Sequence, residues 1–167
     1  MIVLEEATAR GHITCYGVAS ADGFRRPGPA FHALDELLRL ARDVAGQDHH
    51  FRVVELPFNL LMTEALFNRN HIVNGQPATL SEIANMRGIA VRASAALASG
   101  RKLPIPLALR RVCPQFWTDS QIGLQFVRSN RGICTALVGM MSPTHVEENL
   151  LLRREPPIEF DRPAPED

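Results

Sequence analysis

The sequence predicts an α/β fold with a parallel sheet, on the basis of two observations. Four short segments that are mostly apolar and rich in β-branched or small residues begin roughly 40 residues apart, close to the length of a strand–helix–strand unit. Amphipathic segments typical of helices lie between them. Strands that alternate with helices form right-handed crossovers, which give a parallel sheet covered by helices on both faces.

The expected strands are apolar on both faces, as in strands that are buried from both sides. They are residues 13–18, 51–56, 89–93 and 133–138. Cys15 and Cys134 lie inside the first and last of them, and they are expected to be core residues rather than nucleophiles.

The longest amphipathic segment covers residues 30–44 and ends at Gly46. Shorter helices are expected at residues 3–10 and 79–86, because a glycine follows closely in both cases and ends the helix. The apolar residues of the longest segment fall on one helical stripe: Phe31, Leu34, Leu37, Leu38, Ala41 and Val44.

Two further helices begin at N-cap residues. Thr118 is followed three residues later by Gln121, which is the spacing of a capping box. Ser142 is the expected N-cap of the last helix, with Pro143 at the first helical position. The free N–H groups at such a helix start can attract a phosphate, although many helices start this way without a ligand.

Composition and charge exclude several classes of protein. The 167 residues suit one domain with a packed core, and 18 Lys and Arg balance 18 Asp and Glu, which argues against binding to nucleic acid or an anionic membrane. No apolar run approaches a membrane span, and the first residues do not resemble a signal peptide. We therefore expect a soluble, cytoplasmic globular protein.

Metal and disulfide sites are not expected. The three cysteines are widely spaced and form no C-x-x-C, which argues against a disulfide framework or a structural zinc site. His49 and His50 lie at a helix-to-strand turn without further candidate ligands, so a solvated turn is expected there.

Two architectures fit the alternation of strands and helices. A doubly wound sheet would have a glycine-rich phosphate loop, and neither G-x-G-x-x-G nor G-x-x-x-x-G-K-[ST] is present. A (β/α)8 barrel needs about 250 residues, and four units supply half of that. Residues 1–154 form the expected domain. Residues 155–167, with four prolines and five acidic residues, are expected to form a disordered tail.

Segments 118–129, 136–139 and 142–150 resemble the C-terminal signature of the aldo/keto reductase family. Three upstream segments are similar to the fifth, sixth and seventh strands of that family, so that the resemblance spans roughly residues 3–154; they are residues 11–18, 53–59 and 88–97. The resemblance implies strands five to eight of an eight-stranded barrel. The predicted fold is therefore α/β, a parallel (βα)4 half of a TIM-type (β/α)8 barrel.

The resemblance also implies a chemistry. The family reduces aldehydes and ketones with NADPH, which lies across the C-terminal ends of the strands, and an Asp–Tyr–Lys–His tetrad protonates the carbonyl oxygen. The tetrad belongs to strands two, three and four, which have no counterpart in this chain. Tyr16 is the only tyrosine and lies inside an expected strand, so it does not replace the missing acid. No catalytic residue is assigned to this chain.

The nicotinamide end of the cofactor would contact two residues by resemblance. Ser20 matches a position that holds the carboxamide, and Glu55 stands where the family has glutamine. A carboxylate accepts from the amide NH2 but cannot donate to its carbonyl, so Glu55 fulfils half of that role. Alternatively, Glu55 forms a structural ion pair with Arg92. The stacking tyrosine of the family is replaced by Ser94.

The other end of NAD or NADP would contact the remaining candidates. The basic residues that grip the 2′-phosphate in the family are replaced by Gly139 and His145, which removes a permanent cation. Ser142 would offer a helix start to a phosphate. The remaining matches are Leu97 and Ser99 beside the pyrophosphate, and Glu148 and Asn149, which are either adenine contacts or ordinary surface residues.

A half-barrel has two open sheet edges and an uncovered concave face, which we expect to be apolar and to promote association. One hypothesis is an oxidoreductase half that binds NAD(P)H and reduces carbonyl substrates when an N-terminal half completes it. The other is a non-catalytic half-barrel remnant or interaction module that associates with itself as a homodimer. A third physical outcome is an open sheet whose exposed side is covered by residues 62–75.

Overall fold

The computed structural model describes residues 1–159. Its centre is a four-stranded parallel sheet with the strand order β1-β2-β5-β6. The strands are β1 (Tyr16–Ala19), β2 (Phe51–Pro57), β5 (Ala90–Ser94) and β6 (Thr135–Ala136). Each overlaps one of the four expected segments, so the predicted α/β class and parallel sheet are confirmed.

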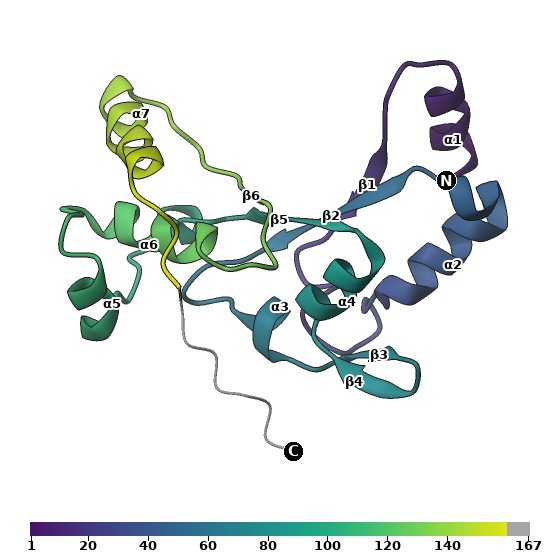
Figure 1. The fold of residues 1–167 in the computed structure, drawn as a ribbon, viewed down its shortest axis with the longest axis horizontal. Helices are drawn as coiled ribbons and strands as arrows, with labels where there is room; N and C mark the ends of the chain where they lie inside the picture. The colour runs from purple at the N-terminus through teal and green to yellow at the C-terminus, as the bar shows by residue number, and fades with distance from the viewer. Residues whose placement is uncertain (160–167) are drawn as a thin grey trace.

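Helices follow the expected order between the strands. Figure 1 shows α1 and α2 at one end of the sheet and α6 and α7 at the other, with α4 beside the middle strands. Both predicted caps are present: Thr118 and Gln121 form the capping box of α6, and Ser142 caps α7. The helices are α1 (Ile2–Ala9), α2 (Leu34–Ala45), α4 (Leu80–Arg87), α6 (Asp119–Arg128) and α7 (Pro143–Leu150).

Several short elements were not expected from the sequence. Between β2 and α4 lie α3 (Glu64–Phe67) and an antiparallel hairpin of β3 (His71–Val73) and β4 (Gln76–Ala78), and α5 (Leu107–Val112) lies between β5 and α6. Three 3-10 turns complete the order: η1 (Gly46–Asp48), η2 (Ala98–Gly100) and η3 (Leu151–Arg154). Since α3 contacts α4 and β3 contacts α2 and α4, segment 62–75 packs against the helices and not over the exposed side of the sheet.

One face of the sheet forms the core. Val54 and Leu56 of β2 are aligned with Val91 and Ala93 of β5, and all four side chains are buried. They belong to one continuous apolar cluster with the inward stripes of α2 and α4. The residues of those stripes are Leu34, Leu38, Ala41, Leu80, Ile83 and Ala84.

The opposite face of the sheet is uncovered, and it is of mixed polarity rather than apolar throughout as expected. Ala19, Glu55, Arg92 and Thr135 are aligned in one row across the four strands, and each is partly or fully exposed. Successive strand residues point to opposite faces, so this row lies on the other side of the sheet from the buried Val54 and Val91. We call this side the uncovered face. Its residues are Gly17, Ala19, Val53, Glu55, Pro57, Ala90, Arg92, Ser94 and Thr135.

The loop between β1 and α2 is fixed by a buried arginine. Arg25 is 3% exposed and its guanidinium donates two hydrogen bonds to the carboxylate of Glu64 in α3, at 2.6 and 3.2 Å. Burial opposes ionisation of Glu64, yet the hydrogen bonds and charge of Arg25 hold the pKa of that carboxyl below its ordinary value. The buried pair therefore joins two segments that are far apart in the sequence.

Helix α1 is held by one carboxylate. Glu5 accepts hydrogen bonds from the hydroxyl of Tyr16 at 2.7 Å, from the backbone N–H of His50 at 2.8 Å and from the ring Nδ1 of His50 at 2.7 Å. Burial raises the pKa of Glu5, but these donors outweigh it and lower the pKa to about 2. His50 is thus a structural partner of α1, whereas its position in the sequence had suggested a solvated turn.

Cys15 and Cys134 are not the core residues that the sequence had suggested. They lie just outside β1 and β6 and are exposed, because both strands are shorter than expected. Cys113 is buried, and all three cysteines are free thiols.

The start of the expected tail is held by α6. The side chain of Gln125 donates a hydrogen bond to the backbone carbonyl of Pro156, and the side chain of Arg128 donates one to the backbone carbonyl of Glu155. Residues 160–167 of the expected tail lie outside the described residues. Within residues 1–159 no helix has the length and apolarity needed to cross a bilayer.

Candidate functional site

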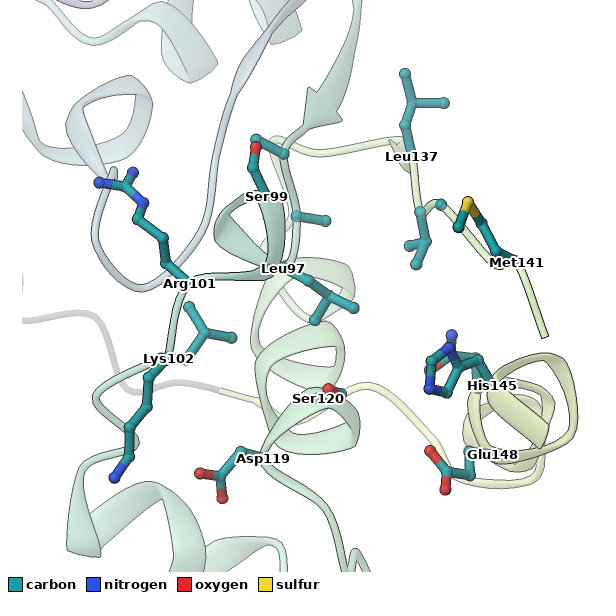
Figure 2. A pocket seen from close by; sticks show the side chains of 17 residues that line it. Leu97, Ser99, Arg101, Lys102, Asp119, Ser120, Leu137, Met141, His145 and Glu148 are labelled. Atoms are coloured by element: carbon teal, nitrogen blue, oxygen red, sulfur yellow. The ribbon is translucent and has the colours of Figure 1, made fainter.

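A cavity of about 790 Å³ opens beyond the carboxyl ends of β5 and β6. It is lined by the loop 95–103, the first turn of α6, the segment 137–141 and one side of α7. Ligands of parallel α/β sheets bind outside the carboxyl ends of the strands, so this is where a site is expected. Figure 2 shows the lining side chains.

The loop after β5 has an unusual backbone. Ala95, Ala98 and Ser99 have φ values of 48°, 51° and 54°, in the left-handed region that residues other than glycine seldom adopt. Asn59, which is fully buried, holds the start of this loop by donating from its side-chain amide to the carbonyl of Ala95 at 2.9 Å. Strained backbone that is fixed in this way is common at functional sites.

Gln121 organises the α6 side of the cavity. Its side-chain oxygen accepts hydrogen bonds from the backbone N–H groups of Trp117 and Thr118, and its amide donates to the carbonyl of Glu148 at 3.0 Å. The first contacts close the N-terminus of α6, and the last one joins α6 to α7. One residue therefore fixes the relative position of two helices that line the cavity.

Most of the residues expected at the pyrophosphate and adenosine end come together here. The cavity is lined by Leu97, Ser99, Gly139, His145, Glu148 and Asn149. Ser142 lies between them in the sequence but does not line the cavity; its hydroxyl accepts a hydrogen bond from the N–H of His145 at 3.2 Å and caps α7.

The two residues expected at the nicotinamide end do not line the cavity. The hydroxyl of Ser20 accepts a hydrogen bond from the N–H of Gly23 at 2.9 Å and stabilises the turn after β1. Glu55 lies on the uncovered face, where its carboxylate is 3.9 Å from the guanidinium of Arg92. The structural ion pair, which was one of the two alternatives for Glu55, is therefore present.

Sequence reasoning missed the cations of the cavity. Arg101 and Lys102 line it directly after the strained loop, and Asp119 and Ser120 line it from the first turn of α6. The resemblance did not indicate these two cations, because Leu97 and Ser99 were the only residues of this loop that it matched to cofactor contacts. The available signal was the pair of adjacent basic residues after Gly100, at the end of a glycine-containing loop that follows a strand.

Charge is distributed unevenly around the cavity. In Figure 2, Arg101 and Lys102 lie at one edge, His145 and Glu148 lie at the other, and Leu97 and Ser120 lie between them. The carboxylate of Asp119, near Lys102, is paired with the guanidinium of Arg110 at 2.5 Å. The edge with Arg101 and Lys102 is therefore cationic, and the edge with Glu148 is not.

Solved structures that match the fold of this chain are aldo-keto reductases. An aldo-keto reductase from Klebsiella pneumoniae in complex with NADPH is 17% identical, with a TM-score of 0.61, and the match covers 95% of this chain and 54% of that one. The chain has the fold of one half of an aldo-keto reductase. The half-barrel predicted from the sequence is thus confirmed at the level of the fold, and the open edges of its sheet are β1 and β6.

Two further structures give the same relationship to this half-barrel. The thermostable aldo-keto reductase Tm1743 in complex with the inhibitor epalrestat is 16% identical, with a TM-score of 0.60 and coverage of 94% and 48% of the two chains. The holo form of aldo-keto reductase AKR11C1 from Bacillus halodurans is 16% identical, with a TM-score of 0.55 and coverage of 93% and 50%. The chain spans about half the length of these structures. No protein-family model and no curated protein matches it.

Other kinds of site find no support in the described part of the chain. Within residues 1–159, no three His, Cys, Asp or Glu side chains are grouped so that they could hold a metal ion. Burial raises the pKa of the Cys113 thiol, which makes it a poor nucleophile at neutral pH. The cavity beyond β5 and β6 is therefore the site on which a function is best argued.

Proposed function

We propose that this chain is the nucleotide-binding half of an aldo-keto-reductase-like oxidoreductase, located in the cytoplasm. In this proposal it binds NAD(P)H in the cavity beyond β5 and β6, and it takes part in the reduction of aldehydes or ketones when an N-terminal half completes the barrel. The observation that carries the proposal is the meeting of Leu97, Ser99, Gly139, Glu148 and Asn149 around one cavity.

The cavity has the features of a nucleotide site. Arg101 and Lys102 offer charge to a pyrophosphate, and Ser99 and Ser120 add hydroxyl groups that can donate hydrogen bonds to its oxygens. Glu148 and Asn149 offer acceptors and donors for the hydroxyl and amino groups of an adenosine. A volume of about 790 Å³ is within the usual range for a cofactor site.

The nicotinamide end fits less well. Ser20 is engaged in a turn, Glu55 is paired with Arg92, and Ser94 has no ring on which the nicotinamide could stack. The residues of this chain thus fit the adenosine and pyrophosphate portion of the cofactor. When bound, NAD(P)H would supply a hydride to a carbonyl carbon, whereas this chain would bind and orient the nucleotide.

Isothermal titration of NADH and NADPH into the full chain tests the proposal. Saturable binding of at least one of them with a stoichiometry of one is expected, and it should weaken markedly in a double variant with Arg101→Ala and Lys102→Ala. A matched control is Arg111→Ala, which removes an exposed cation of α5 that does not line the cavity. Failure of both nucleotides to bind would overturn the proposal.

The second hypothesis, a non-catalytic half-barrel that associates with itself, is supported by the uncovered face. Two copies related by a two-fold axis would place the β1 edge of one copy against the β6 edge of the other. The Glu55–Arg92 ion pair of one copy would then face the same ion pair of the other copy, in the reverse orientation. Mass measurement in solution distinguishes the hypotheses. A stable dimer that binds no nucleotide favours the second one, and a monomer that binds nucleotide favours the first.

A further inference from the structure

The two outer helices, α1 and α7, differ from the helices that connect neighbouring strands. α2, α4 and α6 each bury several side chains in the core that they share with the sheet, among them Leu38, Ile83 and Ile122. In contrast, no residue of α1 or of α7 is buried. Figure 1 shows α1 on the β1 side of the sheet and α7 on the β6 side. The outer helices therefore lack the strand surface that the other three cover.

The outer helices also expose apolar side chains of the kind that helices usually turn toward a core. Ile2 and Val3 of α1 are 63% and 75% exposed, and Leu150 of α7 is 50% exposed. Exposed apolar residues beside an open sheet edge are typical of an interaction surface. Each outer strand, β1 and β6, thus has such a helix next to its free edge.

A hollow of about 190 Å³ lies between α7, α6 and the end of β6. Arg128 fixes one of its walls, because its guanidinium donates hydrogen bonds to the backbone carbonyls of Leu152 and Glu155. The hollow suits the apolar side chains of one more strand, added in parallel at the edge of β6. The lining is mostly apolar and includes Leu124, Ala136, Val138, Met140, Leu150 and Leu152.

A second copy of this chain does not supply that strand without crowding. In a barrel of parallel strands, one helix covers each pair of neighbouring strands. If β1 of one copy paired with β6 of another, α1 of the first copy and α7 of the second would cover the same pair of strands. Both helices are held to their own chain, α1 by the hydrogen bond between Glu5 and Tyr16, and α7 by that between Glu148 and Gln121. The two-copy barrel therefore has one helix too many at each closure.

We infer that the partner of this chain is a four-stranded α/β unit whose sequence begins and ends with a strand. Its outer strands pair in parallel with β1 and β6 beneath α1 and α7, and its own three helices cover its internal strand pairs. The number of strands follows from the reductases of the same fold, since this chain spans about half of their length. The inference rests on the proposed function, because it specifies the half that completes the barrel.

Two natural cysteines report on the outer strands. Cys15 directly precedes β1 and Cys134 directly precedes β6, and both thiols are exposed, whereas Cys113 is buried. A two-copy barrel would bring the start of β1 in one copy beside the start of β6 in the other. A short bismaleimide added to the full chain should therefore give no dimer linked between Cys15 and Cys134. Formation of that dimer, and its loss in Cys15→Ser and Cys134→Ser, overturns the inference.

A separate fragment tests the inferred partner itself. The probe is the fragment of the Klebsiella pneumoniae aldo-keto reductase that carries the four strands without a counterpart in this chain, ended at the fourth strand. With the full chain we expect a complex of one chain with one fragment by sedimentation, in which maleimide labels Cys15 and Cys134 several-fold more slowly than in the free chain. A longer fragment that keeps the helix after its fourth strand should bind less tightly, because that helix competes with α1.

Absence of a complex overturns the inference, as does a complex in which both thiols react as in the free chain, or equal binding of the two fragments. None of these results concerns nucleotide binding by the chain alone, which calorimetry tests separately. The failure of this inference and the failure of the proposed nucleotide site are therefore distinguishable.

Substitutions on the outer helices locate the interaction. Ile2→Asp in α1 and Leu150→Asp in α7 each place a charge on surface that an added strand covers, so each should weaken the complex at least about tenfold. Met86→Asp is the matched control, because Met86 is an exposed apolar residue of α4, which connects two inner strands. All three side chains are exposed, so the free chain should keep its unfolding temperature. Equal weakening in all three variants, or none in the first two, would contradict this docking surface.

Discussion

The side-chain amide of Gln121 donates a hydrogen bond to the backbone carbonyl of Glu148 across 3.0 Å. This contact joins the first turn of α6 to α7, so the capping residue of one helix also positions the other. The two helices line the same cavity, one with Ser120 and the other with Glu148 and Asn149. A residue that the sequence marks as an ordinary cap thus holds the candidate site together.

Separating the two roles of Gln121 gives the first prediction. In Gln121→Glu, a carboxylate oxygen can still accept from the N–H groups of Trp117 and Thr118, but nothing donates to the carbonyl of Glu148. We expect a loss of about 1 kcal/mol in the free energy of unfolding and weaker nucleotide binding. Thr118→Ala, which removes the cap hydroxyl alone, should lower stability by a similar amount without weakening binding. Urea unfolding and calorimetry measure both effects.

The buried amide of Asn59 gives the second prediction. Asn59→Asp keeps the acceptor for the N–H of Leu61 and loses the donor to the carbonyl of Ala95. Because that carbonyl begins the strained loop of the cavity, we expect destabilisation on the order of 2 kcal/mol and a loss of nucleotide affinity. Asn85→Asp on the exposed side of α4 is the control. If Asn59→Asp binds nucleotide as the wild type does, the loop does not depend on this contact.

The low pKa of Glu5 makes stability depend on pH in the acid range. Its folded pKa of about 2 lies below the ordinary value of 4.5, so the unfolded chain binds a proton first as the pH falls. The stabilisation is therefore complete above about pH 5 and is lost as the pH falls through 4 toward 2. Glu5→Gln should lower the free energy of unfolding at pH 7 by on the order of 1–3 kcal/mol, with little difference from wild type near pH 2.

Urea unfolding from pH 7 down to about pH 2 checks this dependence. The matched control is Glu6→Gln, which removes an exposed acid whose contact with Arg10, at 3.9 Å, is worth little. A wild-type chain whose stability relative to Glu5→Gln does not change with pH would show that the carboxylate is not held as described.

The register of β1 against β2 depends on Gly17. A Cβ atom at this position would lie 2.0 Å from the carbonyl oxygen of Val53, and the pairing shifts by one residue between Tyr16 and Gly17. Gly17→Ala should therefore destabilise the chain by about 2 kcal/mol or more, since backbone must move. Gly139→Ala is the control, because open space surrounds its Cβ. Thermal unfolding of the two variants measures the difference.

The sequence predicted the sheet well for a physical reason. The strands β1, β2 and β5 each contain at least one buried side chain, such as Val54 or Val91, and this produces a local apolar signal. The half-barrel predicted an uncovered face, but this face was expected to be apolar and not to carry the row with Glu55 and Arg92, because a strand in the middle of a sheet gives no local sign of whether its second face is covered. That depends on segments elsewhere in the fold.

The candidate site was predicted in part. Glu148 and Asn149, in the last turn of α7, line the cavity, whereas their role as adenine contacts stays a prediction. Arg101 and Lys102 were missed, since their position at the cavity depends on the unusual backbone at Ala98 and Ser99, which no residue preference indicates. Ser20 and Glu55 do not line the cavity, because they belong to the β1 and β2 side of the sheet and the cavity lies beyond β5 and β6.

The central claim is that the cavity beyond β5 and β6 binds a nucleotide, and backbone amide NMR tests it most directly. Titrating NADH into the 15N-labelled full chain should shift the amide resonances of Leu97, Ser99, Gly139 and Asn149 with one common saturation curve. The amides of Ala7 and Leu40, in α1 and α2, should not shift, because they lie at the other end of the sheet. Saturable shifts elsewhere with none around the cavity, or no shifts at all, would contradict the account.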